Sequence, residues 1–154
     1  MIVDKHLEFS DAQAVTSTAI STKVIDLRAG TGAENLVQNE GAGEQPVYLV
    51  VQTQATATDS GSNATLTVTL ESAENEALST NAVVHYTTGA MAFADFATAG
   101  TRLAVVRLPA TANYKRHLGV RYTVADGPLT AGAFDAFLTT DVDVHKKYES
   151  GFTV

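Results

Sequence analysis

A strictly alternating stretch near the end of the chain constrains the fold more than any other feature. Residues 114–139 read YKRHLGVRYTVADGPLTAGAFDAFLT, and in the first half every second residue is apolar: Leu118, Val120, Tyr122 and Val124. A period of two places successive side chains on opposite faces of a sheet. The turn sequence DGP at 126–128 interrupts the pattern. Alternation then resumes less cleanly, with Phe134, Ala136 and Leu138 sharing one face. The stretch predicts two long β-strands joined by a loop.

Other segments of strand length precede this pair. VYLVVQT at 47–53 is a nearly continuous apolar run, which indicates a central buried strand. ATLTVTLE at 64–71 alternates, so its leucines and valine are predicted to face inward and its threonines outward, as on an antiparallel sheet with one solvated face. Shorter strands are expected at 23–28, 82–88, 92–96 and 103–108.

About eight short strands, with turn signals between them and no long helical pattern, predict an all-β sandwich or barrel. Eight antiparallel strands in two sheets fit a jelly roll. An up-and-down barrel and an immunoglobulin-like sandwich stay open, because the strand order does not follow from local patterns. At 154 residues we expect one domain, with an extended N-terminal arm at 1–23 and a jelly-roll domain at 24–154.

The expected arm carries apolar residues scattered among charges: Ile2, Val3, Leu7 and Phe9. Ser10 and Asp11 are able to cap a short helical turn over 12–15. An arm of this kind lies on a neighbouring subunit, and Ile2 and Phe9 are the side chains it would insert there. The alternative is a loosely packed terminus.

Composition and charge exclude several classes of function. The chain has no cysteine, so it has neither disulfides nor a cysteine metal site. A net charge of −7 disfavours broad contact with nucleic acid or an anionic membrane. No run approaches about 18 apolar residues, the length that spans a bilayer. Charges in the first residues are unlike a secretory signal, so we expect a protein made and used without secretion.

No pattern in the sequence amounts to an active site. Asp141, Asp143 and His145 alternate, as metal ligands on one face of a strand would, and His6 lies between Asp4 and Glu8, but solvated charges explain both groups. His85 and His117 lie on expected strands, where packing or surface roles are the ordinary ones. The chain has no Gly-x-Ser-x-Gly elbow, and the glycines at 30–32 lack the rest of a phosphate loop. We expect no enzyme, no cofactor and no metal.

One basic cluster is visible in this acidic chain. Lys115, Arg116 and His117 are consecutive, and Arg121 and Arg107 belong to nearby expected strands. Such a cluster is suited to docking on an acidic partner. The alternative is a charged strand edge that blocks unwanted pairing.

Five segments in sequence order resemble the capsid cement, or decoration, proteins of tailed bacteriophages, of the type in a Bordetella podovirus. They are AVTSTAISTKVIDL, PVYLVVQT, ATLTVTLES, RLAVVRLP and YKRHLGVRYTVADGPLTAGAFDAFL, and they span residues 14–138. The resemblance implies a jelly-roll domain on the outer surface of the phage head that bridges neighbouring major capsid proteins. It implies a structural virion protein rather than an enzyme, made in the host cytoplasm. It also implies homo-oligomers, with dimers favoured and trimers as the alternative.

The resemblance supplies no binding signature for single residues, so the candidate capsid or subunit interface comes from the arm and the basic cluster. Its members are Ile2, Val3, Leu7, Phe9, Lys115 and Arg116. The expected partners are the major capsid protein and further copies of the chain, without nucleic acid or membrane. The alternative function is a carbohydrate-binding β-sandwich module of a phage adhesin. Sugar platforms need exposed aromatic rings, for which Tyr114 and Tyr148 are the loop candidates.

Overall fold

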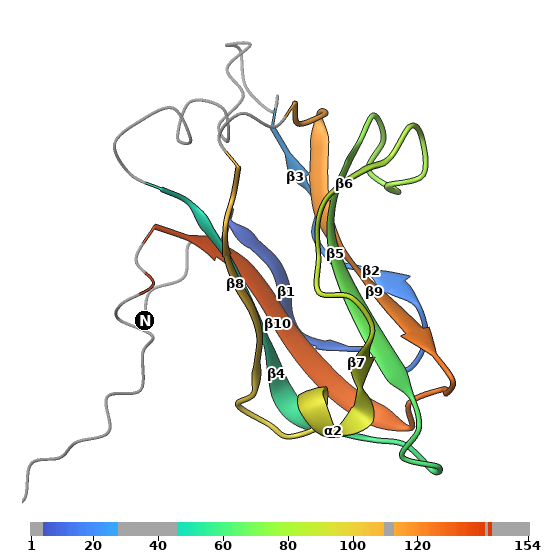
Figure 1. Cartoon of the computed structure of the whole chain (residues 1–154). Coiled ribbons are helices and arrows are strands. Elements are labelled where there is room, and N and C mark those ends of the chain that lie inside the picture. The colour runs from blue at the N-terminus through green and yellow to red at the C-terminus, as the bar shows by residue number, and fades with distance from the viewer. Residues whose placement is uncertain (1–4, 28–45, 110–112, 141, 143–154) are drawn as a thin grey trace, which may run out of the picture.

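The computed structural model describes residues 5–27, 46–109, 113–140 and 142, and most of them belong to two antiparallel sheets that face each other (Figure 1). Sheet A contains, in spatial order, β1 (Glu8–Ala14), β10 (Ala131–Thr139), β4 (Tyr48–Thr58) and β8 (Arg102–Arg107). Sheet B contains β2 (Ala19–Ile20), β9 (His117–Ala125), β5 (Thr65–Ala73) and β6 (Val83–Thr87). Two short strands complete sheet B: β3 (Ile25–Asp26) pairs with β9, and β7 (Met91–Ala92) pairs with β5.

The strand order is that of a jelly roll. Strands β2 and β3 share one position beside β9, and β6 and β7 share one beside β5, which leaves eight positions in the described part of the chain. Numbered along the chain, these positions follow the order 1-8-3-6 in sheet A and 2-7-4-5 in sheet B. Two interlocked Greek keys give this arrangement. The prediction of an all-β jelly-roll sandwich is confirmed, and the barrel and immunoglobulin-like alternatives are excluded.

The core lies between the sheets and follows the alternation seen in the sequence. In sheet B the inward positions of β5 and β9 are buried: Leu66, Val68, Leu70, Leu118, Val120 and Tyr122. Sheet A opposes them with Leu49, Val51, Phe134, Ala136 and Leu138. Burial of one such large side chain contributes roughly 1.5–3 kcal/mol. The interleaved apolar faces are therefore the main source of stability.

The N-terminal segment differs from the expected arm. Strand β1 is an edge strand of sheet A that pairs with β10, and Phe9 is fully buried in the core. The predicted helical turn at 12–15 is also wrong, since β1 continues to Ala14. Register shifts between Glu8 and Ser10 and between Ser10 and Gln13 interrupt the period of two. An extra residue at a bulge moves the later side chains to the opposite face of the sheet. The sequence of β1 therefore lacks the alternation that predicts a strand.

Two other segments also depart from prediction. The strand expected at 92–96 is replaced by the single helical turn α2 (Phe93–Phe96), which places the fully buried Phe96 in the core. The Thr53 hydroxyl donates a hydrogen bond of 2.6 Å to the Phe96 carbonyl oxygen, which fixes this turn on β4. The strand expected at 23–28 is reduced to β3. The glycine-rich loop predicted at 29–45 lies outside the described residues.

The position of Phe9 gives a test that separates a core strand from an arm. We predict that Phe9→Ala lowers the free energy of unfolding by about 3–5 kcal/mol, the usual range for removing a buried aromatic ring. The measurement is urea unfolding of the full chain, and Val105→Ala, at a site 41 % exposed, is the matched control, with a change within about 0.5 kcal/mol. A Phe9→Ala variant as stable as the control would mean that β1 is not part of the folded core.

Candidate interaction surface

The apolar residues predicted for the interface fall into three groups. Ile2 and Val3 lie outside the described residues. Leu7 is half-buried against the core, and its carbonyl oxygen accepts a hydrogen bond of 2.8 Å from the Leu138 N–H. Phe9 has no exposed surface. Its assignment to an interface is therefore wrong, because the ring already fills the protein's own core and has nothing left to insert into a partner.

Arg116 is held by an acidic residue that is distant in sequence. Its Nε lies 3.1 and 3.2 Å from the two carboxylate oxygens of Asp26, and its second nitrogen Nη2 lies 2.8 Å from Oδ2. The hydrogen bond to this carboxylate and its charge raise the pKa of Arg116. The pair joins β3 to the start of β9. Asp26 therefore already balances the charge that Arg116 would offer to another protein.

Lys115 is tied to the loop that connects β5 to β6. Its Nζ donates a hydrogen bond to the Asn81 carbonyl oxygen and lies 3.9 Å from Glu74 Oε1. The loop itself is internally bonded, since Asn75 Oδ1 accepts hydrogen bonds from the Ser79 and Thr80 N–H groups at 3.0 and 2.9 Å. Lys115 therefore stabilises a structured loop.

Arg121 has a similar internal role on the outward face of sheet B. Its Nε lies 3.1 and 3.0 Å from the two carboxylate oxygens of Glu71, and Nη2 donates 2.9 Å to the Leu78 carbonyl oxygen. Leu78 is buried over Gly119, where an added Cβ would lie 2.7 Å from its Cδ1. Gly119 thus lets the loop pack directly on the sheet. Arg107 lies in sheet A, so the predicted basic cluster is divided between the two sheets.

A buried polar cluster lies beside Lys115. Ser72 Oγ is 2.7 Å from His85 Nε2 and accepts a hydrogen bond of 3.0 Å from the Lys115 N–H. The Tyr114 ring packs on the imidazole with centroids 4.4 Å apart. Burial lowers the pKa of His85 and raises the pKa of Tyr114 to about 12. Tyr114 is 4 % exposed, so this loop candidate for sugar stacking is covered.

The cluster favours a neutral histidine. Ser72 is fully buried and its oxygen already accepts the Lys115 N–H. The Ser72 hydroxyl has one proton to donate, and His85 Nε2 lies within hydrogen-bond distance of it. Nε2 is able to accept this proton only when the imidazole is neutral. Protonation would turn Nε2 into a donor and leave the hydroxyl proton without that acceptor. The arrangement is a structural anchor for the start of β9, because the serine has no access to an external substrate.

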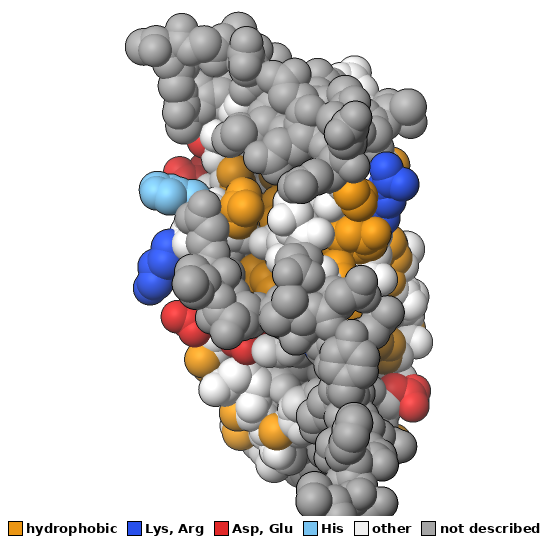
Figure 2. All heavy atoms as spheres, turned by 90° about the vertical axis from the view of Figure 1, so that its left-hand side faces the viewer, with side chains coloured by type: hydrophobic (Ala, Val, Ile, Leu, Met, Phe, Trp, Pro, Cys, Tyr) orange, Lys and Arg blue, Asp and Glu red, His pale blue; other side chains and the backbone are white. Residues whose placement is uncertain are grey.

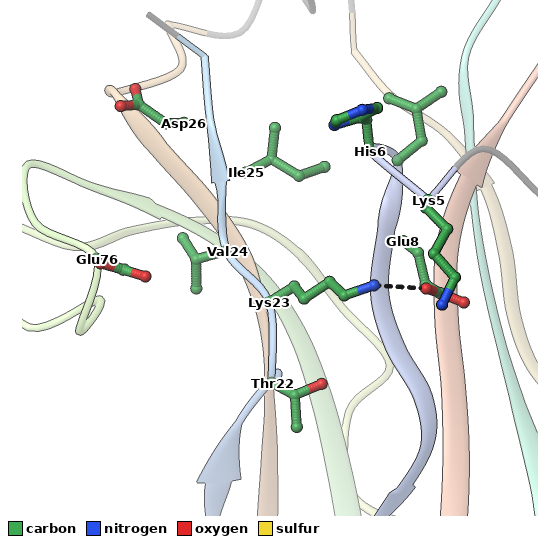
Figure 3. Close-up of a pocket in the computed structure, with 10 residues that line it drawn as sticks. Lys5, His6, Glu8, Thr22, Lys23, Val24, Ile25, Asp26 and Glu76 are labelled. Carbon is green, nitrogen blue, oxygen red and sulfur yellow. Dashed lines mark hydrogen bonds and ion pairs between the residues drawn. The ribbon is translucent and has the colours of Figure 1, made fainter. Parts of the chain in front are cut away.

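A groove of about 450 Å³ was not predicted from the sequence. It lies between residues 5–8 at the start of β1 and residues 22–26 around β3, and Glu76 of the β5–β6 loop also lines it (Figure 3). The Lys23 ammonium lies 2.7 Å from Glu8 Oε2 across this groove. Apolar side chains, Val24 and Ile25 among them, line it between the charged groups. Only the three-dimensional pairing of β1 and β3 with different sheets brings these segments together.

The outward face of sheet A carries a second set of apolar side chains. Strand register places Val50 of β4 opposite Phe137 of β10 and opposite Val105 of β8. Val50 and Phe137 are 1 % and 4 % exposed, whereas Val105 is 41 % exposed. Figure 2 views the molecule from the side on which sheet A lies, and hydrophobic side chains gather there in the upper half between basic side chains at the two edges. Of the three residues, Val105 is the one open to solvent.

The metal candidates receive no support within the described chain. Asp141, Asp143 and His145 lie outside the described residues, as does Asp4 beside His6. Among the residues that are described, no group of three His, Asp or Glu side chains is placed to hold a metal ion. The described residues also form no helix long and apolar enough to cross a membrane.

The histidine cluster predicts a pH dependence of stability. In the unfolded chain His85 has an ordinary pKa near 6.5, and in the folded protein burial lowers this pKa. The contribution of His85 is fully present above about pH 6.5 and is lost as the pH falls toward the folded pKa, because the unfolded chain binds the proton more readily. His85→Gln keeps an acceptor for Ser72 but does not titrate. We predict a smaller loss of unfolding free energy between pH 7.5 and 5 for this variant, measured by urea unfolding. Equal losses in both proteins would show that His85 does not titrate differently on folding.

Comparison with known proteins identifies the family. No curated protein matches the chain. The model of one protein family, Bbp16, matches residues 9–138, which include every strand from β2 to β9, most of β10 and all but the first residue of β1. The matched region is thus the sandwich itself, with the hydrogen-bonded loop and the Ser72–His85 cluster. The chain therefore belongs to the Bbp16 family, which is associated with Bordetella phage.

Proposed function

We propose that this protein is a structural component of a phage particle that decorates the outer surface of the head and bridges neighbouring major capsid proteins. The observation that carries the proposal is the match to a Bordetella phage family over residues 9–138, a region that folds as a jelly-roll sandwich. The resemblance of five strand segments to capsid cement proteins points the same way. The proposed role is mechanical rather than catalytic, and its partners are the capsid protein and further copies of this chain.

The fold is suited to such a role because it is stiff. Strands β4 and β10 pair along most of their length, and β5 and β9 pair without a register shift from Thr65 to Ala73. The two long pairs enclose the apolar core. A rigid body of this kind transmits force between two contact points without unfolding, so it is able to raise the free energy needed to separate neighbouring capsomers.

Repetition of the capsid lattice strengthens a modest contact. If each copy binds one capsid site and two copies are linked as a dimer, the second contact forms at a high effective concentration. Occupancy then exceeds that of a single contact without any additional bonds. We therefore propose a homo-oligomer as the bridging unit, with a dimer favoured over a trimer. The net charge of −7 suits a location on the outside of the shell, away from the packaged nucleic acid.

Binding to heads tests the proposal directly. Purified protein is mixed with undecorated phage heads, the heads are pelleted, and their surface is imaged by electron microscopy. We predict stoichiometric density on the outer surface, and its symmetry axis distinguishes a dimer from a trimer. A well-folded protein that binds no head of its own phage would overturn the proposal, and a thermal shift with a glycan would then favour the carbohydrate-binding alternative.

The remaining apolar candidates near the start of the chain give a second test. We predict that Ile2→Ser with Val3→Ser raises the dissociation constant for heads by about tenfold or more, because loss of two apolar contacts removes roughly 1.5 kcal/mol or more of binding free energy. The midpoint of urea unfolding should stay that of the wild type. Lys5→Ser, at an exposed neighbouring position, is the matched control. A dissociation constant for the double variant equal to that of the wild type would remove Ile2 and Val3 from the interface.

A further inference from the structure

One long stretch of the chain carries no ionised side chain although much of it faces water. Residues 77–94 form the longest run without Asp, Glu, Lys or Arg in a sequence that is 18 % charged. They include the end of the β5–β6 loop, then β6, β7 and the start of α2. Core burial does not explain the lack of charge, since many members are exposed: Ala77, Ser79, Thr80, Asn81, Ala82, Val83, Val84, Thr87, Gly89, Ala90, Ala92 and Ala94. We call these residues the neutral strip.

The neutral strip lies on a free edge of sheet B. Strands β6 and β7 pair with β5 on one side, and no strand of the described chain pairs with their other side. An edge strand presents unpaired backbone N–H and C=O groups, and proteins usually protect such an edge with charges or proline. Strand β6, VVHYT, has neither a proline nor an ionised carboxylate, lysine or arginine. Val83 and Val84, 40 % and 54 % exposed, lie on this edge.

The other strand edges of the sandwich are charged. Strand β8, the far edge of sheet A, begins with Arg102 and ends with Arg107. Strand β1, at the opposite edge of sheet A, contains Glu8 and Asp11, and β3 contains Asp26. The sequence thus places charge on three edges and leaves it out of the fourth. Depletion of charge at an exposed position is the composition expected at the centre of a protein interface.

The charge of the whole chain indicates which partner suits this edge. Each copy carries a net charge of −7, so two copies repel each other over most orientations. Contact through the neutral strip places no carboxylate of one copy against a carboxylate of the other within the strip. A basic partner would instead gain most from the acidic parts of the surface. The arrangement therefore favours a second copy of this chain as the occupant.

We propose that the neutral strip is the contact surface of a homodimer, in which β6 and β7 of one copy lie against the same strands of a second copy. A two-fold axis uses the same patch on both copies, so a patch without net charge is compatible with itself. Val83 and Val84 supply the apolar contact, and the small side chains of residues 90, 92 and 94 allow close approach. The inference rests on the proposed function in taking a dimer as the bridging unit. The choice of the neutral strip as the contact surface rests only on the exposure of its side chains and on its lack of charge.

Sedimentation of the full chain tests this assignment. Wild type, Val84→Lys and Val105→Lys are compared at neutral pH and physiological salt over a range of concentrations. Val105 is the matched control, because it is a 41 % exposed valine on the edge strand of the other sheet. We expect the wild type to be a dimer. In Val84→Lys two lysines face each other across the two-fold axis, and we expect the dissociation constant of the dimer to rise about 100-fold or more. We expect no change in this constant for Val105→Lys. If Val84→Lys fails to fold, Ala92→Lys, at an exposed position of β7, takes its place.

Three outcomes would overturn the assignment. They are a wild-type chain that stays monomeric at every concentration, a folded Val84→Lys variant that dimerises like the wild type, and a Val105→Lys variant that dissociates as readily as Val84→Lys. Binding to heads is measured separately on the same samples. A dimer that depends on Val84 but binds no heads would support this surface and refute the decoration role. If Val84→Lys protein stays dimeric but no longer binds heads, the neutral strip contacts the capsid protein rather than a second copy, and the inference is overturned.

Discussion

The packing of Tyr122 between the sheets is the interaction on which the rest of the structure depends. This residue belongs to β9, and its ring stacks on Phe134 of β10 with centroids 5.6 Å apart. Its hydroxyl donates a hydrogen bond of 3.0 Å to Ser10 of β1, and burial raises the tyrosine pKa well above its usual value. One side chain of sheet B thus contacts two strands of sheet A. The stacking fixes how the sheets face each other, and the hydrogen bond satisfies the polar end of a ring that is otherwise surrounded by apolar groups.

The charged residues of sheet B serve mainly to complete the fold. Arg121 and Glu71 hold the β5–β6 loop over Gly119, Lys115 holds the same loop from the side, and Arg116 is bound to Asp26. A cluster of basic residues in a sequence suggests a docking site for an acidic partner. Here the partners are carboxylates and carbonyl oxygens of the same chain, so the cluster adds rigidity where β3, β9 and the loop meet.

This internal use of charge changes where an interaction surface is expected. The outward face of sheet B is covered near Gly119, and the middle of the outward face of sheet A holds the buried Val50 and Phe137. The β6–β7 edge combines exposed valines with an absence of ionised groups. In the decoration role that we propose, contact between copies through this edge would leave the ends and loops of the sandwich for the capsid.

The sequence by itself determined the strands with an undisturbed period of two and the face that each of their residues occupies. That pattern is local, and it identified β5 and β9 together with their inward residues. Tertiary structure decided what local pattern cannot express. Bulges concealed β1 and its core residue Phe9, the Thr53 bond and the burial of Phe96 turned an expected strand into α2, and the Arg116–Asp26 pair joins residues 90 positions apart. The strands that meet across the sandwich determine the strand order, the groove beside β3 and the exposure of the neutral strip. Such long-range pairing depends on the free energy of the whole core rather than on any one segment.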